Sequence, residues 1–140
     1  MRLVIQRVKK ARVNDVKIGP GLLVLLGVGQ KDSVKEAETL ARKLAKLRVM
    51  ADRDGKMNLS INEVKGEILV ISQFTLHAET KGGNRPSFIR AASPNLAKQV
   101  YEHFIAALRN EGVLVKNGTF GSYMKITATL DGPVTILYLD

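Results

Sequence analysis

The sequence predicts a mixed α/β domain that is rich in strands and carries two main helices. Apolar residues alternate, or run continuously, in short segments along most of the chain, as they do in strands. Two longer segments instead place apolar residues at helical spacing behind recognisable N-terminal caps. Because these helices do not alternate regularly with the strands, a doubly wound sheet with βαβα order is not expected.

The first part of the chain is expected to form three strands. Residues 2–13 alternate loosely between apolar and polar side chains and predict the first of them. Asn14-Asp15 predicts a turn, and residues 16–18 a short return strand. Gly19-Pro20-Gly21 then breaks the chain. Leu22 to Val28 is predicted as a central strand buried on both faces, because its apolar run is continuous.

Two helices have clear boundary signals. The first is predicted to begin after Ser33, because Ser33 and Glu36 stand at the N-cap and N3 positions of a capping box. Apolar residues then recur at helical spacing as far as Leu47. The second helix opens with Ser93-Pro94, an N-cap followed by proline at the first helical position. Gly112 is suited to end it, because glycine readily adopts the left-handed conformation that follows many helices.

The remaining strands are expected at residues 59–61, 67–74, 113–115, 124–130 and 134–139, with Gly55 in a turn before them. Gly132-Pro133 separates the last two strands. Proline cannot donate to a strand ladder, and glycine weakens a strand interior. The strand pairing is therefore expected to end there, or else the backbone of Gly132-Pro133 has a function of its own.

Composition and charge limit the function. The chain contains no cysteine, so it forms no disulfide and uses no thiolate chemistry. It has no segment that is long and apolar enough for a membrane span, and its N-terminal apolar stretch is too short for a signal peptide, so a cytoplasmic location is expected. The formal net charge of +9 indicates a polyanionic partner, although a merely basic surface has the same composition. One candidate contact surface is the face of the first helix that carries Lys35, Arg42, Lys43 and Lys46.

Two motifs are better explained by turns than by ligand binding. Gly27-Val28-Gly29 resembles the start of a dinucleotide-binding fingerprint, but Asp32 stands where the third glycine is needed. Residues 52–63 resemble a calcium-binding loop, but Lys56 occupies a ligand position and Met57 the position that needs glycine. A strand-to-helix turn and a loop turn are therefore predicted at these two places.

The densest candidate site is Ser72-Gln73-Phe74-Thr75-Leu76. A buried strand delivers these residues to its end, and a loop rich in glycine and basic residues follows at 82–88. A polar strand end beside a mobile loop explains the pattern equally well. Thr75 has no base beside it to activate it as a nucleophile, whereas backbone N–H groups there can stabilise an oxyanion. His77 lies nearby and His103 is expected to be exposed, but isolated histidines make neither a metal site nor a secure catalytic pair.

Two stretches resemble the signature motifs of a known family. Ser72-Gln73-Phe74-Thr75-Leu76 and Gly132-Pro133-Val134-Thr135 are similar to the two motifs of D-aminoacyl-tRNA deacylases. The resemblance covers the whole chain and includes Gln6-Arg7-Val8, Arg85-Pro86-Ser87-Phe88, and Gly118-Thr119-Phe120-Gly121 with Met124. Leu130 departs from the pattern, because the family usually has asparagine two residues before the glycine of Gly-Pro. This change removes any hydrogen bond that the asparagine makes but leaves the backbone role of Gly-Pro intact.

The resemblance implies a fold and an activity. The implied fold is a compact single domain of residues 1–140, with β-rich, barrel-like mixed sheets and two main helices packed outside. Two copies are expected to form a homodimer with active sites at the subunit interface. The implied activity is hydrolysis of the ester that joins a D-amino acid to the acceptor end of tRNA, which releases free D-amino acid and tRNA. No cofactor or metal is implied, and neither a membrane nor DNA is expected as a partner.

The resemblance also implies roles for particular residues. Ser72, Gln73, Phe74 and Thr75 are expected to form the catalytic pocket through backbone and lining contacts, with Thr75 not acting as a nucleophile. The residues expected to bind substrate and form a chiral gate are Arg7, Phe120, Met124, Gly132, Pro133, Val134 and Thr135. The Gly132–Pro133 peptide is expected to be cis and to enter the pocket of the other subunit, where its carbonyl oxygens collide with an L side chain. Positioning, an oxyanion donor near Phe74-Thr75 and the 2′-hydroxyl of the tRNA are then sufficient to cleave an activated ester.

Two interpretations of other classes stay open at this point. The charge of +9 is also compatible with a non-catalytic RNA- or DNA-binding module. A metal-dependent hydrolase is a further alternative, against which the two histidines and the absence of cysteine argue. Hydrolysis of a D-aminoacyl-tRNA, but not of its L counterpart, distinguishes the binding module from the enzyme.

Overall fold

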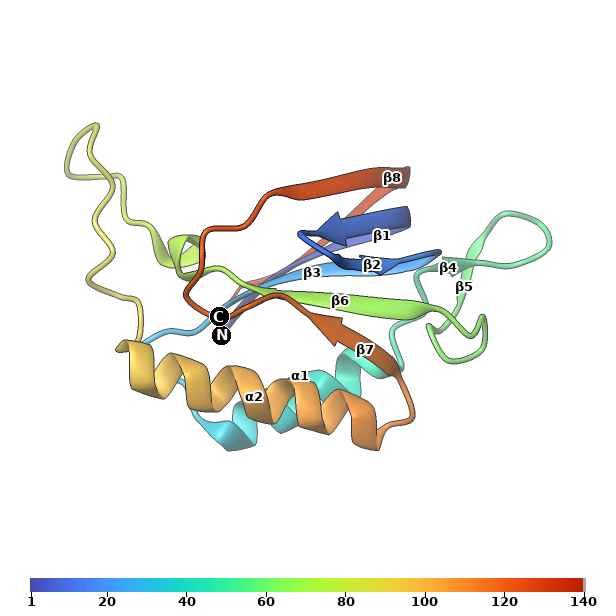
Figure 1. Cartoon of the computed structure of the whole chain (residues 1–140), viewed down its shortest axis with the longest axis horizontal. Coiled ribbons are helices and arrows are strands. Elements are labelled where there is room, and N and C mark those ends of the chain that lie inside the picture. The colour runs from blue at the N-terminus through green and yellow to red at the C-terminus, as the bar shows by residue number, and fades with distance from the viewer. Residues whose placement is uncertain (140) are drawn as a thin grey trace.

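The computed structural model describes residues 1–139, in which two α-helices lie side by side on one face of a strongly curved sheet (Figure 1). Asp140, the last residue of the domain expected from the sequence, lies outside the described residues. The main sheet consists of β1 (Arg2–Val13), β2 (Val16–Ile18), β3 (Gly21–Gly27), β6 (Glu67–Ser72), β7 (Leu114–Asn117) and β8 (Ile126–Tyr138). The helices are α1 (Val34–Ala45) and α2 (Pro94–Asn110). A hairpin of β4 (Met50–Ala51) and β5 (Met57–Leu59) and a 3₁₀ turn, η1 (Phe74–His77), complete the elements.

The strand order explains why both helices lie on one face. β1 pairs antiparallel with β2, β3 and β8, whereas β3–β6 and β6–β7 are parallel pairs. Parallel neighbours need a crossover connection, which α1 supplies between β3 and β6 and α2 supplies between β6 and β7. Such crossovers are right-handed, so two that step in the same direction across a sheet put both helices on the same face. The sheet is therefore not doubly wound, as expected from the sequence.

The sheet curves until its two ends nearly meet. β2 and β7 stand at opposite ends of the strand order. Lys116 of β7 joins them, because its ammonium donates to the Lys17 carbonyl oxygen of β2 at 2.8 Å and pairs with the Glu67 carboxylate at 2.9 Å. The hydrogen bond from Lys116 lowers the pKa of Glu67, against the opposing effect of burial. The barrel-like sheet is thus confirmed, with a side chain instead of a ladder across the last gap.

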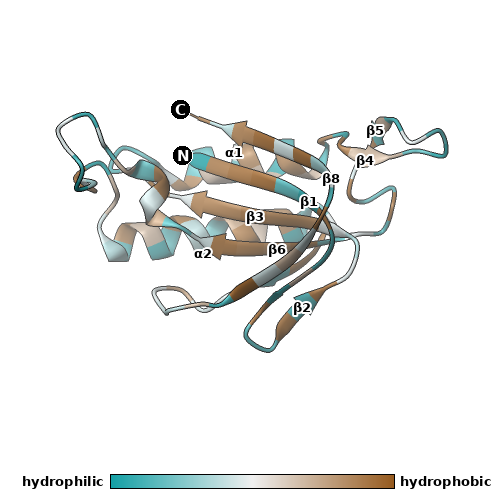
Figure 2. Cartoon of the chain, turned by 90° about the horizontal axis from the view of Figure 1, so that it is seen from above, coloured by the Kyte–Doolittle hydropathy of each residue, from teal (hydrophilic) through white to brown (hydrophobic). Residues whose placement is uncertain are grey.

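The core has two parts, one on each face of the central strands. Leu22, Val24 and Leu26 of β3 pack between the sheet and the helices. Leu23 of β3 packs on the other face, inside the curl of the sheet, with Ile71 of β6. β3 is therefore buried on both faces, as its continuous apolar run predicts, and β3 and β6 are hydrophobic along their lengths in Figure 2.

The predicted helices form with small changes at their ends. Ser33 and Glu36 make the full capping box: the Glu36 amide donates to Ser33 Oγ at 3.3 Å and the Ser33 amide to Glu36 Oε2 at 2.8 Å. α1 ends at Ala45, two residues before Leu47. Ser93 stands at the N-cap of α2 but makes no capping hydrogen bond through its side chain. None of the described helices is long and apolar enough to cross a membrane.

Several predicted strand boundaries are wrong. β3 spans Gly21–Gly27, one residue earlier at each end than predicted, and β8 spans Ile126–Tyr138 instead of beginning at residue 124 and ending at 139. β6 ends at Ser72 instead of Phe74, because the chain turns there into η1. The short strand expected at residues 59–61 lies at Met57–Leu59, where it pairs with β4. β7 begins at Leu114, one residue later than expected, and continues to Asn117.

The last two predicted strands are one strand, β8, that pairs with β1 along its length. Thr135 pairs with Gln6 and Leu130 with Val8, so residues 131–134 oppose Arg7 alone and bulge out of the ladder. The pairing therefore opens at Gly132-Pro133 and resumes after it, instead of ending there. The Gly132–Pro133 peptide is cis, as the resemblance implied.

We expect Gly21→Ala to destabilise the fold, because a Cβ on Gly21 would lie against the carbonyl oxygen of Glu67 in the neighbouring strand, closer than van der Waals contact allows. Forcing β3 and β6 apart should lower the free energy of unfolding in urea by about 1–3 kcal/mol or more. Gly19→Ala is the matched control two residues away. Its Cβ would meet nothing within 4 Å, so it should change the unfolding free energy by less than about 1 kcal/mol. Equal losses in the two variants would contradict this account.

Candidate active site at the end of β6

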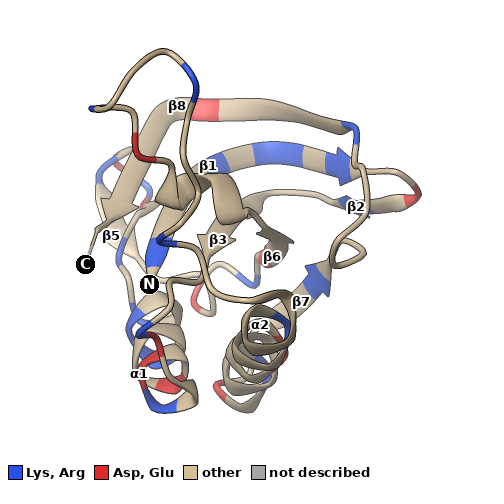
Figure 3. Ribbon diagram, turned by 90° about the vertical axis from the view of Figure 1, so that its left-hand side faces the viewer, with Lys and Arg blue, Asp and Glu red and all other residues tan. Residues whose placement is uncertain are grey.

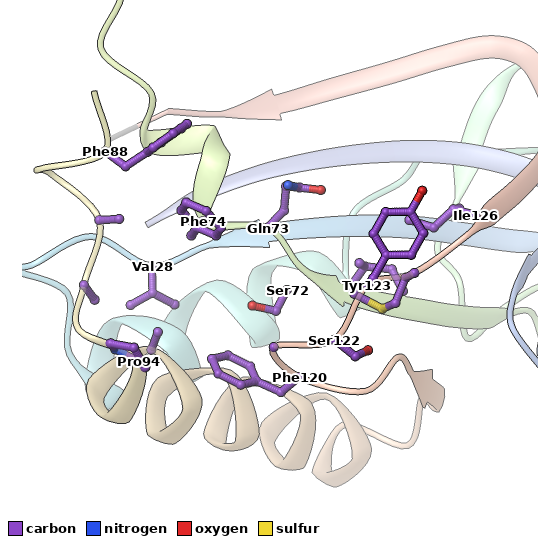
Figure 4. A pocket seen from close by; sticks show the side chains of 16 residues that line it. Val28, Ser72, Gln73, Phe74, Phe88, Pro94, Phe120, Ser122, Tyr123 and Ile126 are labelled. Carbon is purple, nitrogen blue, oxygen red and sulfur yellow. The ribbon is translucent and has the colours of Figure 1, made fainter. Parts of the chain in front are cut away.

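A cavity of about 620 Å³ opens where β6 ends (Figure 4). Its lining is mostly apolar and comes from segments that are far apart in the sequence. Ser72, Gln73 and Phe74 form one side, and residues 88–97, which lead into α2, form another. The segment 120–126, which leads into β8, contributes the rest of the wall, and Val28 contributes from the end of β3.

The η1 turn at the edge of this cavity packs on the end of β3. The Gln73 amide donates to the Leu26 carbonyl oxygen at 2.8 Å and so extends the pairing of β6 with β3 by one residue. A Cβ on Gly27 would lie 2.9 Å from the Gln73 carbonyl oxygen, and a Cβ on Gly29 would lie 2.9 Å from the ring of His77. Glycine is needed at both positions because η1 approaches the backbone this closely. Gly27 and Gly29, which resemble a dinucleotide fingerprint in the sequence, thus form the surface against which η1 packs.

The η1 turn carries polar side chains and also backbone amides that make no hydrogen bond within the turn. The Gln73 side-chain amide donates to Thr75 Oγ1 at 2.6 Å, which orients both side chains. The hydrogen bonds of the turn begin with the Leu76 amide, which donates to the Gln73 carbonyl oxygen at 3.2 Å. The amides of Phe74 and Thr75 come before it and make no bond within the turn. Amides of this kind are the donors that stabilise an oxyanion.

Aromatic rings form part of the cavity wall. Phe74 and Phe88 meet edge to face, with ring centroids 5.1 Å apart and an interplanar angle of 73°. Phe120 packs on Tyr101 of α2, with ring centroids 5.6 Å apart. The Tyr101 hydroxyl donates to the Val70 carbonyl oxygen of β6 at 3.0 Å, and burial raises the pKa of Tyr101 to about 12. Tyr101 therefore fastens α2, and the ring of Phe120 above it, to β6.

The loop of residues 79–91 projects from the sheet beside the cavity (Figure 1). Its base is fixed, because Glu79 and Ser87 exchange backbone hydrogen bonds of 2.8 and 2.9 Å and the Gln30 side chain donates to the Ile89 carbonyl oxygen. The Lys81 amide, together with the charges of Arg90 and Lys81, lowers the pKa of Glu79. Glu79 is therefore a carboxylate at neutral pH and helps to fold the loop.

Arg7 organises the bulge of β8. Its side chain is buried, with the residue 8% exposed. Nε donates to the Asp131 carbonyl oxygen at 3.1 Å and lies 3.4 Å from the Asp131 carboxylate. Nη1 donates to the Val49 carbonyl oxygen, beyond the end of α1, at 2.9 Å. The guanidinium thus ties the bulge to two other parts of the fold.

The bulge itself needs glycine at its centre. Gly132 has φ of +129°, a conformation that L residues rarely adopt, and a Cβ there would lie 2.9 Å from Val134 Cγ2. The ladder resumes at Thr135, whose hydroxyl donates to Gln6 Oε1 at 2.6 Å. Gly132 and Pro133 are exposed, so their backbone is available to another molecule.

The residues predicted from the sequence fall into two groups within one chain. Ser72, Gln73, Phe74, Phe120 and Met124 line the cavity, and Thr75 follows Phe74 in η1. Arg7, Gly132, Pro133, Val134 and Thr135 do not line it. Arg7 is opposite Leu22 of β3 and Ser72 is opposite Leu26. These positions are four residues, or roughly 13 Å, apart along the sheet.

Several lining residues were not predicted. Phe88 is the last residue of the glycine-rich loop 82–88, which the sequence placed beside the candidate site, so its place in the lining could have been inferred. Val28, Tyr123 and Ile126 carry no comparable signal, because they meet only when residues 120–126 fold across the end of β6. Tyr123 is 88% exposed, which makes it the most open aromatic side chain of the cavity.

Other candidate groups do not form a second site of this kind. His77, the last residue of η1, is buried and its Nε2 makes no hydrogen bond, whereas His103 is exposed on α2 as expected. Asp52 Oδ1 accepts from the amides of Asp54 and Lys56 at 2.9 and 3.0 Å, so residues 52–56 form the predicted turn. Residues 1–139 contain no group of three or more side chains with metal-binding chemistry.

The motifs are those of a known family. A family model described as D-Tyr-tRNA(Tyr) deacylase matches residues 4–139. The D-aminoacyl-tRNA deacylase of Deinococcus radiodurans is 52% identical over 141 residues, and the match covers 97% of each chain. The D-aminoacyl-tRNA deacylase of Thermosipho melanesiensis is 49% identical, and the match covers 98% of this chain and 95% of the relative.

Two solved structures resemble the fold over nearly its whole length. One is named c-Myc DNA Unwinding Element Binding Protein; it is 40% identical, with a TM-score of 0.92, and the match covers 100% of this chain and 99% of the other. The second is described as a probable eukaryotic D-amino acid tRNA deacylase, with a TM-score of 0.84 over 98% of this chain and 97% of the other. At 18% identity, this second likeness shows the fold alone.

We expect Tyr101→Phe to change how stability depends on alkaline pH. The raised pKa of Tyr101 means that the unfolded chain releases this proton near pH 10 and the folded protein only near pH 12. Tyr101 therefore makes the native state lose stability as pH rises from about 10 to about 12. Below pH 9 the variant should be less stable by about 1 kcal/mol, because it lacks the hydrogen bond to Val70. Urea unfolding at pH 9 and pH 11 should show that this difference shrinks; a constant difference would contradict the assignment.

Proposed function

The chain belongs to the D-aminoacyl-tRNA deacylase family, and we propose that it hydrolyses D-aminoacyl-tRNA in a pocket that two copies of the chain complete together. As a member of this family it is an ester hydrolase of translation proofreading. The observation that carries the proposal is that the two family motifs lie apart from each other within one chain. The cavity holds the first motif, and the second motif lies elsewhere in the same chain.

The cavity suits the end of an aminoacyl-tRNA. Its volume of about 620 Å³ is that of a small-molecule site. The terminal adenosine and the amino-acid side chain offer flat or apolar groups, which the rings of Phe74, Phe88 and Phe120 can contact. Ser72 and Gln73 supply the few polar groups that fix the orientation of such a ligand.

Hydrolysis is assigned mainly to positioning. A water oxygen bonds to the ester carbonyl carbon as the water gives up a proton, and the carbonyl oxygen becomes an oxyanion. The carbonyl double bond then re-forms, the bond from the carbonyl carbon to the ribose oxygen breaks, and the ribose oxygen takes up a proton. The amides of Phe74 and Thr75 are the donors that we assign to the oxyanion. The lining contains no histidine, carboxylate or lysine, so the 2′-hydroxyl of the tRNA is the proton-transfer group assigned to the reaction.

The second motif supplies stereochemical selection from the partner copy. Gly132 and Pro133 are exposed at the β8 bulge, outside the cavity of their own chain. Placed in the cavity of a second copy, their carbonyl oxygens face the Cα of the substrate and leave no room for an L side chain. Backbone atoms suit this task because they have no alternative rotamers.

β8 also offers a surface for the second copy. Leu130 and Leu137, on either side of the bulge, are 45% and 55% exposed. Exposed apolar side chains beside a functional segment are typical of protein interfaces. In a twofold dimer each copy gives its bulge to the partner and receives the partner's bulge, which produces two equivalent sites.

The tRNA substrate accounts for the charge of +9, and we expect the reaction to take place in the cytoplasm. A nucleic-acid-binding function is the alternative, because one solved relative is named as a DNA-unwinding-element binding protein. The apolar cavity that holds the first motif favours the enzyme, because a binding module needs no such cavity at the end of a strand.

We expect the purified protein to hydrolyse D-tyrosyl-tRNA and to leave L-tyrosyl-tRNA intact. Thr75→Ala should retain at least roughly a tenth of the activity, because the Thr75 hydroxyl has no base beside it and accepts a hydrogen bond from the Gln73 side chain. Loss of a covalent nucleophile would instead lower the rate by about 10⁴-fold or more. Thr75→Ser is the matched control. If serine preserved activity while alanine abolished it, or an acyl group were trapped on Thr75, the positioning mechanism would be wrong.

We expect Gly132→Ala to lower kcat/KM for D-tyrosyl-tRNA by roughly 100-fold, because the added methyl group forces the bulge to move and small misplacements at a reacting centre are costly. Gly112→Ala is the matched control: Gly112 also has a positive φ, of +80°, but lies after α2 with open space around it. This control should lose stability and keep its activity.

Mixing two inactive variants tests whether the bulge acts on the partner. Ser72→Phe fills the cavity and keeps an intact bulge, whereas Gly132→Ala keeps an intact cavity. Mixed dimers then contain one site with both parts intact, so the re-equilibrated mixture should recover about a quarter of wild-type activity. No recovery, from variants shown to exchange subunits, would place the bulge in the site of its own chain.

A further inference from the structure

A cationic strip crosses the outer face of the barrel on β1 and β2. It consists of Lys10 and Arg12, two residues apart on β1, and Lys17 of β2, which pairs directly with Arg12. Residues two apart in a strand, and residues directly paired between strands, point to the same face. All three residues are exposed, and Figure 3 shows Lys and Arg gathered on this part of β1.

The charge of the cationic strip is not balanced within the protein. Arg12 and Lys17 are like charges directly opposite each other, an arrangement that is unfavourable in a sheet. In residues 1–139 the strip has one ion pair, between Arg12 and Asp15 at 3.8 Å, in which Asp15 is fully exposed. Exposed pairs of this kind contribute little. Arg12 Nε also donates to the Asn14 carbonyl oxygen at 2.6 Å, but this partner is neutral, so the strip keeps an excess of positive charge that can bind an external anion.

The cationic strip begins one residue away from the cavity wall on β8, on the opposite face of that strand. On β8, Thr127 pairs with Arg12 and Thr129 with Lys10, so both threonines add hydroxyl groups to the strip. Ile126 immediately precedes Thr127 and lines the cavity. Successive residues of a strand point to opposite faces, so one strand presents Ile126 to the cavity and Thr127 to the strip.

We propose that the cationic strip holds phosphates of the acceptor stem of the same tRNA whose 3′ end occupies the cavity. This assignment rests on the proposed function and extends it from the reacting end to the stem. Lys10 and Arg12 are ~6.8 Å apart along β1, so the two side chains can contact neighbouring phosphates of one RNA strand. Lysine, arginine and threonine side chains are common donors to phosphate oxygens, and they fix position without reading sequence.

A second copy of the chain is a poorer occupant of the strip. A twofold contact centred on the strip would place it against an equal positive charge. The basic face of α1 is a less suitable site for the stem. α1 contributes no residue to the cavity, and Lys43 lies over the ring of Tyr138, 5.0 Å from its centroid. This face therefore provides a control with similar charge in a different place.

The test compares two triple variants. The strip variant is Lys10→Gln/Arg12→Gln/Lys17→Gln, and the control is Lys35→Gln/Arg42→Gln/Lys46→Gln; each lowers the formal charge by three, from +9 to +6. Binding of deacylated tRNA is measured at 50 and 200 mM salt, and hydrolysis is measured with D-tyrosyl-tRNA and with the D-tyrosyl ester of adenosine, which lacks the stem.

Three phosphate contacts should account for roughly a 20- to 40-fold loss of tRNA affinity between 50 and 200 mM salt. A variant without these contacts should lack that part of the salt dependence. The strip variant should therefore bind tRNA weakly at 50 mM salt, with a flatter salt dependence, yet hydrolyse the adenosine ester at the wild-type rate. The control should resemble the wild type with both substrates. Unchanged salt dependence in the strip variant, or an equal change in the control, would overturn the proposal. A wild-type protein that hydrolysed neither D-ester would disprove the proposed function, while the tRNA-binding comparison would still decide the role of the strip.

Discussion

The buried guanidinium of Arg7 is the constraint on which the arrangement of the second motif depends. A buried charge is costly unless it is paired and hydrogen-bonded, so its partners are held firmly. Those partners are Asp131 in the β8 bulge and the Val49 carbonyl oxygen after α1. The one side chain therefore links β1, β8 and the helical layer, and it fixes the exposed backbone of Gly132-Pro133 to the rigid part of the fold.

The place of the cavity follows from the parallel strands. β3 and β6 run in the same direction and are buried on both faces, so the chain must leave both at one edge of the sheet. Loops that leave the carboxyl ends of parallel strands form the usual binding crevice of such sheets. The η1 turn can approach that edge only because Gly27 and Gly29 have no side chain. Strand direction and two missing methyl groups thus determine where the first motif lies.

Local sequence signals predict the parts of this fold that local physics controls. The capping box at Ser33, the proline at the start of α2 and the apolar run of β3 each predicted their element, because caps and periodicity act within a few residues. The continuity of β8 could not be predicted in this way, because the strand is held across Gly132-Pro133 by pairing with β1, which is distant in sequence. The same limit applies to the candidate site. The Ser72–Thr75 stretch has a strand-end pattern, whereas Tyr123 joins the cavity only through tertiary folding.

The bridge from Lys116 to β2 also has a consequence for aggregation. Because a side chain spans the last gap of the barrel, β2 and β7 each keep an edge without a neighbouring strand. A free strand edge is a template for pairing with other chains. Here the edges are only three and four residues long, and each carries a lysine, Lys17 or Lys116. Short length and positive charge therefore protect this seam from intermolecular β-pairing, a protection that a closed ladder would provide by itself.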